Sequence, residues 1–241
     1  TSYADQHKDF YDQVRDRNQY PAVMYAKVFR DIANEDTPLE RRTVIQYWLC
    51  YYFNDPIGDE YEHEADWEMV QVVLGSDNEP ESAIYSQHTG GVERKWDAVW
   101  GEDSHPHVFV DKGTHANYFE PGSQRGSIAA LFDYAAGKDG DELTDEWDAR
   151  AGETPETESL YTQSWLNFPG RWGEPPDGPR GPSFNDLHQW DNPLGWWNGH
   201  NTISVNDTAA TAEFSSPPPS QSSATLLALF SLENLSTISE P

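Results

Sequence analysis

The chain has little cysteine, few cationic residues and no long apolar run in its 241 residues. Its single cysteine, Cys50, excludes a disulfide bond within the chain. Cys50 lies in the apolar stretch "QYWLCYYF", so we expect a buried thiol that packs as a small hydrophobic side chain. No stretch reaches the roughly 18 to 20 apolar residues of a membrane-spanning helix. The sequence therefore predicts no transmembrane segment.

Acidic side chains greatly outnumber basic ones. The chain has 15 Lys and Arg against 42 Asp and Glu, which gives a formal net charge of −27. A field of that sign repels nucleic acids, so we expect no nucleic-acid partner. Acidic residues spread along the chain also suit a protein from a high-salt organism, because salt screens their repulsion. An ordinary acidic secreted protein is the alternative. We expect the chain outside the cell, secreted or on the cell surface.

Sequence patterns divide the chain into three parts. Residues 1–40 have apolar residues at helical spacing, among them Val23, Val28 and Phe29, and Pro21 is placed to begin a helix, so they predict a helical N-terminal arm. Residues 41–205 predict the main domain. Residues 206–241 combine a Ser/Pro linker with an apolar C-terminal tail, which would pack on its own domain or on a neighbouring copy.

The main domain has the pattern of an antiparallel β-sandwich. Short aromatic and β-branched runs alternate with clusters of Gly, Pro, Asn and Asp, which is typical of sandwiches and barrels rather than of βαβ units. One short helix is expected at 126–137. A later segment rich in Trp, Gly and Pro, residues 161–200, predicts a long ordered loop that lays aromatic rings over the sandwich. The expected strands are 43–53, 67–74, 82–88, 98–100 and 107–113.

The stretch "YEHEADWEMVQVVL" concentrates acidic residues at the entry of a predicted strand. Asp66 and Glu68 are two residues apart, so on a strand they share one face, while Trp67 and Met69 face the other way. Two carboxylates on one face repel, and a divalent cation is the simplest compensation. Oxygen ligands with one or two imidazoles favour Mg²⁺, Ca²⁺ or Mn²⁺ over Zn²⁺. A solvated strand edge is the alternative. Further imidazoles at predicted strand ends are those of His88, His105, His107 and His115.

Several motifs resemble, in order and spacing, the Vps62-like family. They are "QYWLCYYFND", "HEADWEMVQVVL", "YSQHTGG", "HPHVFVDKGTHANYF" and "GRWGEPPDGPRGP", and together they run from about Thr43 to Pro182. A more distant likeness is to the necrosis- and ethylene-inducing-like proteins, whose His followed by Asp-Trp-Glu is a divalent-metal site on a β-sandwich. That resemblance implies a metal bound by Asp55, His63, Asp66 and Glu68. Glu64 and Ala65 stand where the toxins carry Arg and His, which does not favour toxin activity.

Three functions stay open from the sequence. The first is a metal-binding sandwich that recognises a glycan or another surface ligand, with Trp165, Trp172, Trp196 and Trp197 as stacking surfaces, unless these rings only cover the core. The second is a metal-dependent hydrolase or lyase with His115 or His88 as general base. The third is a subunit of an extracellular filament or homo-oligomer that is joined through the C-terminal tail. Whether the chain is an enzyme is left undecided.

Overall fold

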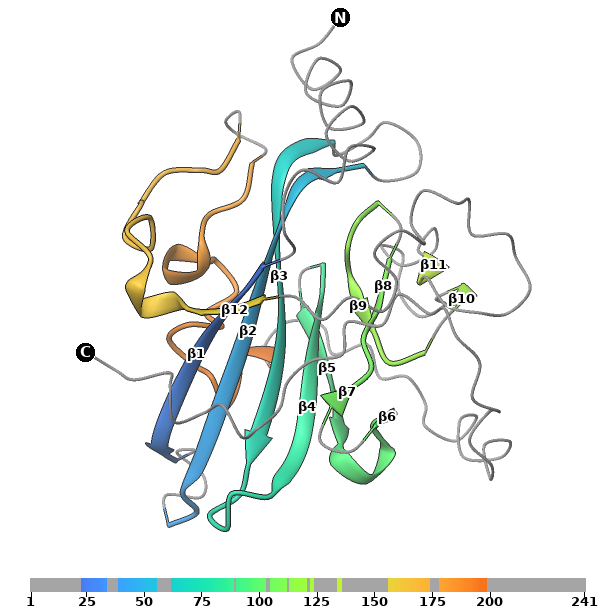
Figure 1. Cartoon of the computed structure of the whole chain (residues 1–241), viewed down its shortest axis with the longest axis vertical. Coiled ribbons are helices and arrows are strands. Elements are labelled where there is room, and N and C mark those ends of the chain that lie inside the picture. Colours follow the sequence, from blue (N-terminus) through green and yellow to red (C-terminus); the bar gives the residue numbers. More distant parts are fainter. Residues whose placement is uncertain are drawn as a thin grey trace, which may run out of the picture.

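The main body of the protein is one large twisted β-sheet (Figure 1). In the computed structural model the sheet has six strands in the order β12-β1-β2-β3-β4-β5. All neighbouring pairs are antiparallel except β1 and β12. The strands are β1 (Val23–Ile32), β2 (Arg42–Asn54), β3 (His63–Leu74), β4 (Pro80–Gln87), β5 (Gly90–Lys95) and β12 (Glu156–Ser159). The structure describes residues 23–33, 39–55, 62–88, 90–102, 105–111, 113–120, 122–123, 134–135, 156–173 and 178–198.

The smaller elements are two-residue strands and short 3₁₀ turns. Among the described residues no helix is longer than one such turn, and none could cross a membrane. The small strand pairs are β6 (Gly101–Glu102) with β7 (His105–Pro106), β8 (Phe109–Val110) with β9 (Asn117–Tyr118), and β10 (Gly122–Ser123) with β11 (Tyr134–Ala135). The 3₁₀ turns are η1 (Trp96–Ala98), η3 (Leu160–Thr162), η4 (Pro182–Phe184) and η5 (Trp196–Asn198).

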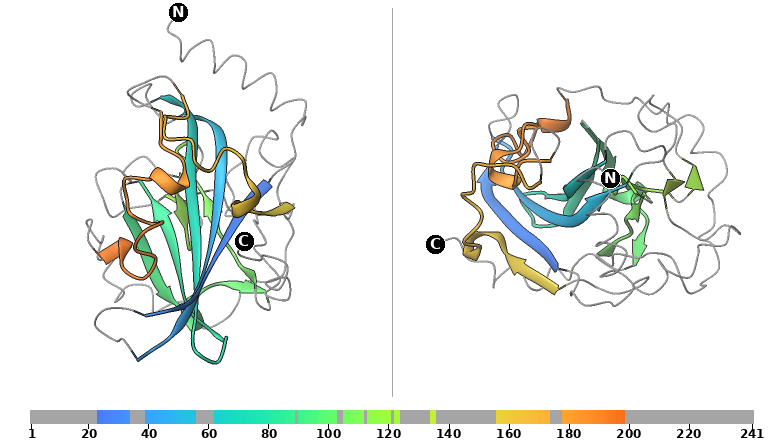
Figure 2. Two further views of the ribbon diagram at one scale, coloured as in Figure 1. Left: turned by 90° about the vertical axis from the view of Figure 1, so that its left-hand side faces the viewer. Right: turned by 90° about the horizontal axis from the view of Figure 1, so that it is seen from above.

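Both faces of the large sheet are covered. One face carries the core of Val70, Val72 and Tyr85, which packs against Val108, Phe119 and their neighbours around β8 and β9. The other face carries Trp48, Trp67 and Met69 and lies under the Trp-rich segment, residues 160–198. The two covers lie on opposite sides of the sheet in the views from the side and from above (Figure 2). The mainly β prediction is confirmed, whereas a second large sheet, which a sandwich needs, is not found among the described residues.

Residues 23–32 form a strand, so the predicted helix over this stretch is wrong. Met24 and Val28 belong to one core, whereas Tyr25 and Phe29 pack on the other. A strand with both faces covered has apolar residues at every parity, so pairs three and four residues apart arise without a helix. Since β1 pairs with β2 along most of its length, this stretch belongs to the main sheet and not to a separate arm. Residues 1–22 lie outside the described part.

Other sequence predictions have mixed outcomes. The strands expected at 43–53, 67–74 and 82–88 are β2, β3 and β4; all three begin earlier than predicted, and β4 ends one residue earlier, at Gln87. Residues 98–100 are not a strand, because they end the η1 turn and lead into β6. The expected helix at 126–137 and the tail from 206 lie outside the described residues, except that 134–135 form β11. Cys50 is exposed, so the expected buried thiol is wrong.

A row of polar side chains crosses the sheet on the face under the Trp-rich segment; Lys27, Gln46 and Gln71 are buried and Glu93, at the edge, is exposed. Lys27, Gln46 and Gln71 are direct cross-strand partners on β1, β2 and β3, and Ile84 and Glu93 continue the row on β4 and β5. We call Lys27, Gln46, Gln71 and Glu93 the polar row. Polar groups inside an apolar core are costly unless they are bonded, so the partners of this row decide its effect.

The polar row holds the Trp-rich segment. Gln46 Nε2 donates to the Gln189 carbonyl at 2.7 Å, and Gln71 Nε2 donates to the Pro193 carbonyl at 2.8 Å. The Trp196 indole donates to Gln71 Oε1 at 3.3 Å, and the Trp197 indole donates to Glu93 Oε2 at 3.1 Å. The Lys27 ammonium lies 2.9 Å from the centre of the Trp190 ring. These contacts fix an irregular segment over the sheet where the chain has no strand to pair.

Replacing Gln71 by Leu should therefore destabilise the fold. The change leaves the Pro193 carbonyl and the Trp196 indole buried without their partner, which costs about 1–3 kcal/mol. Urea unfolding followed by tryptophan fluorescence measures this loss. The control is Gln163→Leu, because the Gln163 amide bonds at the surface to Glu158 and Ser159. Equal stability of the two variants would contradict the role given to the polar row.

Tyr47 and Tyr85 should make the fold sensitive to alkali. Burial raises the pKa of both phenols well above the ordinary value of 10.0. Above about pH 10 the unfolded chain loses these protons while the folded chain keeps them, so the free energy of unfolding falls as pH rises. Absorbance at 295 nm should show that most of the 12 tyrosines titrate first and that the buried ones titrate only as the protein unfolds. Complete titration of a folded chain near pH 10 would contradict this.

Candidate functional site

The acidic end of β3 carries two carboxylates on the sheet face that the chain around β8 and β9 covers. Asp66 and Glu68 stand on the same face as Val70 and Val72, while Trp67 belongs to the opposite core, as the period of a strand predicts. Asp66 is opposite Tyr51 of β2, and Glu68 is opposite Leu49. Glu68 is only 6% exposed. These carboxylates are therefore interior groups and not a solvated strand edge.

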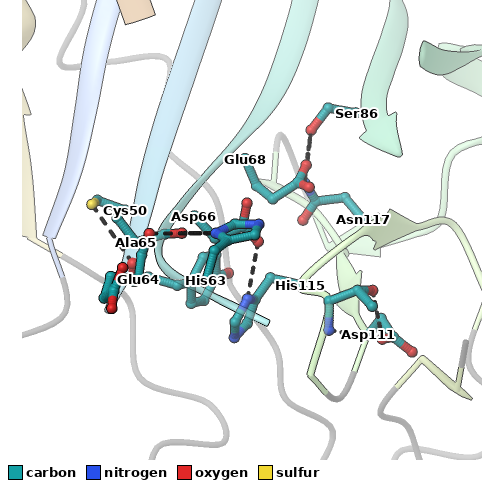
Figure 3. Close-up of polar contacts among 12 residues, drawn as sticks. Cys50, His63, Glu64, Ala65, Asp66, Glu68, Ser86, Asp111, His115 and Asn117 are labelled. Atoms are coloured by element: carbon teal, nitrogen blue, oxygen red, sulfur yellow. Dashed lines mark hydrogen bonds and ion pairs between the residues drawn. The ribbon is translucent and has the colours of Figure 1, made fainter. Parts of the chain in front are cut away.

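The loop that joins β8 to β9 meets both of these carboxylates and Asp55. We call residues 113–117 the GTHAN loop after their sequence. The Gly113 carbonyl accepts the Asp55 N–H at 3.0 Å. His115 Nδ1 lies 3.1 Å from Asp66 Oδ2, and Asn117 Nδ2 donates to Glu68 Oε2 at 3.4 Å. Gly113 thus bonds to the backbone of Asp55, while the side chains of His115 and Asn117 lie beside Asp66 and Glu68 (Figure 3).

Unusual backbone conformations produce this arrangement. Ala65 and His115 have φ values of 56° and 57°, and Gly113 has a φ of 113°. The left-handed region costs a residue with a side chain on the order of 1–3 kcal/mol, and such residues are common at functional sites. The Asp111 carboxylate stabilises the turn, because its Oδ2 accepts the Thr114 N–H at 3.2 Å and the Thr114 hydroxyl at 2.7 Å. The contact of Asp66 with His115 therefore involves two strained positions, His115 itself and Ala65, which precedes Asp66.

The His115 imidazole is buried and held in one orientation. Its side chain is 2% exposed, and that of Asp66 is 14% exposed. The Tyr51 ring stacks on it with centroids 3.9 Å apart and an interplanar angle of 9°. With the proton on Nδ1, His115 donates to Asp66 and Nε2 carries the free lone pair. A carboxylate that orients an imidazole in this way is common around metal-binding and proton-transferring histidines.

Glu68 forms a second buried group with Ser86 of β4 and Asn117 of β9. The Ser86 hydroxyl donates to Glu68 Oε2 and accepts the Met69 N–H at 2.8 Å. Asn117 Nδ2 lies 3.3 Å from Ser86 Oγ. Asn117 is fully buried, yet its Oδ1 has no hydrogen-bond partner among the described residues. A buried amide oxygen in this state is an acceptor that a cation or a water molecule would satisfy.

The four residues expected to bind a metal are only partly brought together. Asp55, Asp66 and Glu68 all meet the GTHAN loop, but His63 Nδ1 bonds back to the Ala65 carbonyl of its own strand at 2.7 Å. In the described part of the chain, no three His, Cys, Asp or Glu side chains are grouped closely enough to share one ion. The residues that sequence reasoning missed are Ser86, Asn117 and Tyr51. The signal for Ser86 was a polar residue inside the apolar run "SAIYS".

The other predicted site residues lie elsewhere. His88 is in the turn after β4, with a φ of 49°, one residue beyond Gln87, whose amide donates to the Asn117 carbonyl. Trp196 and Trp197 are 2% and 6% exposed, which favours their role as covers of the core. They lie in the core of the opposite sheet face, so a sugar stacked on them could not touch an ion at the GTHAN loop. Trp165 and Trp172 pack on that same opposite face.

The fold and the site define a class of β-sheet protein with a buried carboxylate and imidazole cluster under a strained loop. Comparison of the chain with protein-family models, with curated proteins and with solved structures finds no match. The function is therefore inferred from the residues of the site.

Proposed function

We propose that the chain binds a divalent cation where the GTHAN loop covers the acidic end of β3. The observation that carries this proposal is the pair of interior carboxylates, Asp66 and Glu68, beside the unsatisfied Oδ1 of Asn117. Two carboxylates on one strand face repel, and burying them is costly unless positive charge is near. A divalent cation beside these carboxylates would supply such charge, in addition to the His115 imidazole that lies beside Asp66.

The donor set favours a hard cation. Carboxylate and amide oxygens are the preferred ligands of Mg²⁺, Ca²⁺ and Mn²⁺, whereas a zinc site would need Cys or several His. Mg²⁺ keeps several waters and needs only one or two carboxylates, so the lack of a larger cluster among the described residues does not oppose it. Asp66, Glu68 and Asn117 would hold the ion. Asp55, directly after β2, and His63, at the start of β3, lie at the neighbouring strand ends.

The family likeness supports the same site and extends the proposal to a ligand. The more distant resemblance to the necrosis- and ethylene-inducing-like proteins implies a metal at Asp55, His63, Asp66 and Glu68. A bound cation with open positions would bind oxygen atoms of an external ligand such as a glycan. The acidic composition fits a secreted or surface protein that works in salt. The assembly function stays a prediction, because the C-terminal tail lies outside the described residues.

Thermal unfolding with added cations tests the proposal. A saturating cation stabilises the folded state, and a concentration on the order of 100 times Kd should raise Tm by roughly 5–10 °C. Asp66→Asn and Glu68→Gln should each remove most of this rise. NaCl at equal ionic strength measures general screening of the net charge, and Glu79→Gln is the matched control, because Glu79 is an exposed acid in the turn before β4. A rise that is equal in all variants would contradict a cation site here.

The Asp66–His115 pair favours hydrolysis as a second candidate function. Asp66 orients the imidazole through Nδ1, so Nε2 of His115, on the other side of the ring, would be the atom that accepts a proton from water. In a metal-replete preparation, turnover of a phosphodiester or uronate panel should be lost in His115→Ala and kept in His188→Ala, which changes an exposed histidine. Turnover that survives in His115→Ala, or its absence from the wild type, would contradict this second function.

A further inference from the structure

Two arginines lie directly opposite each other in the Trp-rich segment. Arg171 and Arg180 are partners in an isolated antiparallel β-bridge. The Trp172 N–H donates to the Pro179 carbonyl at 2.8 Å, and Arg171 Nη1 donates to the Gly178 carbonyl at 2.8 Å. Like charges at opposed positions of a strand pair destabilise each other. The chain has only 15 Lys and Arg, so two arginines at opposed positions are unusual here and suggest a binding role.

Trp172 and Gly181, which follow the two bridge partners, show which side of the bridge faces the sheet. The Trp172 ring packs edge-on against Trp67 of β3, with centroids 5.4 Å apart. A Cβ atom on Gly181 would lie 2.8 Å from Trp172 Nε1, so glycine allows this arm to lie against the indole. Because side chains alternate along extended chain, Arg171 and Arg180 project from the other side, away from the sheet.

Both guanidinium groups are available to an external anion. Arg180 is exposed and Arg171 is half-buried. Within the described residues neither forms an ion pair with a carboxylate. The sequence between them contains Glu174 and Asp177, which lie outside the described residues and are the competing internal counter-charges. Guanidinium groups bind the oxygens of a carboxylate through paired charge-assisted hydrogen bonds, and the bridge places these two arginines opposite each other.

We propose that Arg171 and Arg180 bind the carboxylate of an acidic sugar, at a site separate from the cation site. The net charge of −27 repels polyanions over long range but allows one small anion at a local pair of cations. Phe168, 46% exposed, lies three residues before Arg171 and packs edge-on against Trp172 at 6.0 Å; it is an exposed ring of the kind that sugar rings stack on. The two sites lie over opposite faces of β3, so neither needs the other.

Calorimetric titration of the full chain with glucuronate, at fixed ionic strength, tests this site. The wild type should bind glucuronate saturably and should not bind glucose, which has the ring without the charge. Arg180→Gln should weaken binding by about tenfold or more, since it removes a charge-assisted pair. The matched control is Arg41→Gln, because Arg41 is an exposed arginine that pairs with Asp31. Its affinity should equal that of the wild type.

Three results would overturn the proposal. No saturable binding by the wild type would mean that carboxylates of the chain itself neutralise the two arginines. Equal affinity of Arg180→Gln and Arg41→Gln would place the sugar elsewhere. Inorganic phosphate or sulfate that competes as well as glucuronate would show a site for charge alone and not for a sugar. Glucuronate binding that persists in Asp66→Asn with chelator would support a separate site, whatever the outcome for the cation.

Discussion

Both faces of the six-stranded sheet are apolar, and the need to cover them determines the rest of the structure. One face is covered by the chain around β8 and β9, and the other by the irregular Trp-rich segment. The second cover has little regular structure, so it depends on the polar row. Gln46 and Gln71 bond to each other at 3.0 Å and to carbonyls of that segment. Hydrogen bonds at the centre of the sheet thus replace strand pairing.

The candidate site is a consequence of the same covering. The acidic end of β3 has an apolar side, which includes Trp67, and a carboxylate side, which meets the GTHAN loop. Strain at Ala65 and His115 brings the loop and the strand together at Asp66. The tryptophans are on the other side of the sheet and therefore serve packing there.

Local pattern predicted the strands with clear boundaries and the shared face of Asp66 and Glu68, because both depend only on the period of a strand. It failed for β1, where apolar residues on two covered faces imitate helical spacing. Local pattern also could not predict the exposure of Cys50 or the surroundings of Trp196, because both depend on which distant segment covers that face of the sheet. His115 and Asn117 contact Asp66 and Glu68, which lie 49 residues earlier in the sequence. No local pattern predicts such a contact, because it depends on how the strained loop folds back onto β3.

The central claim is that the acidic end of β3 holds a divalent cation. The most direct measurement is the metal content of the purified chain after dialysis against Mg²⁺, Ca²⁺ or Mn²⁺, with Asp66→Ala and Glu79→Gln treated in parallel. The account predicts about one ion per chain in the wild type and in Glu79→Gln, in line with the few carboxylates such an ion needs, and a large loss in Asp66→Ala. A metal-free wild type, or an unchanged Asp66→Ala variant, would contradict it.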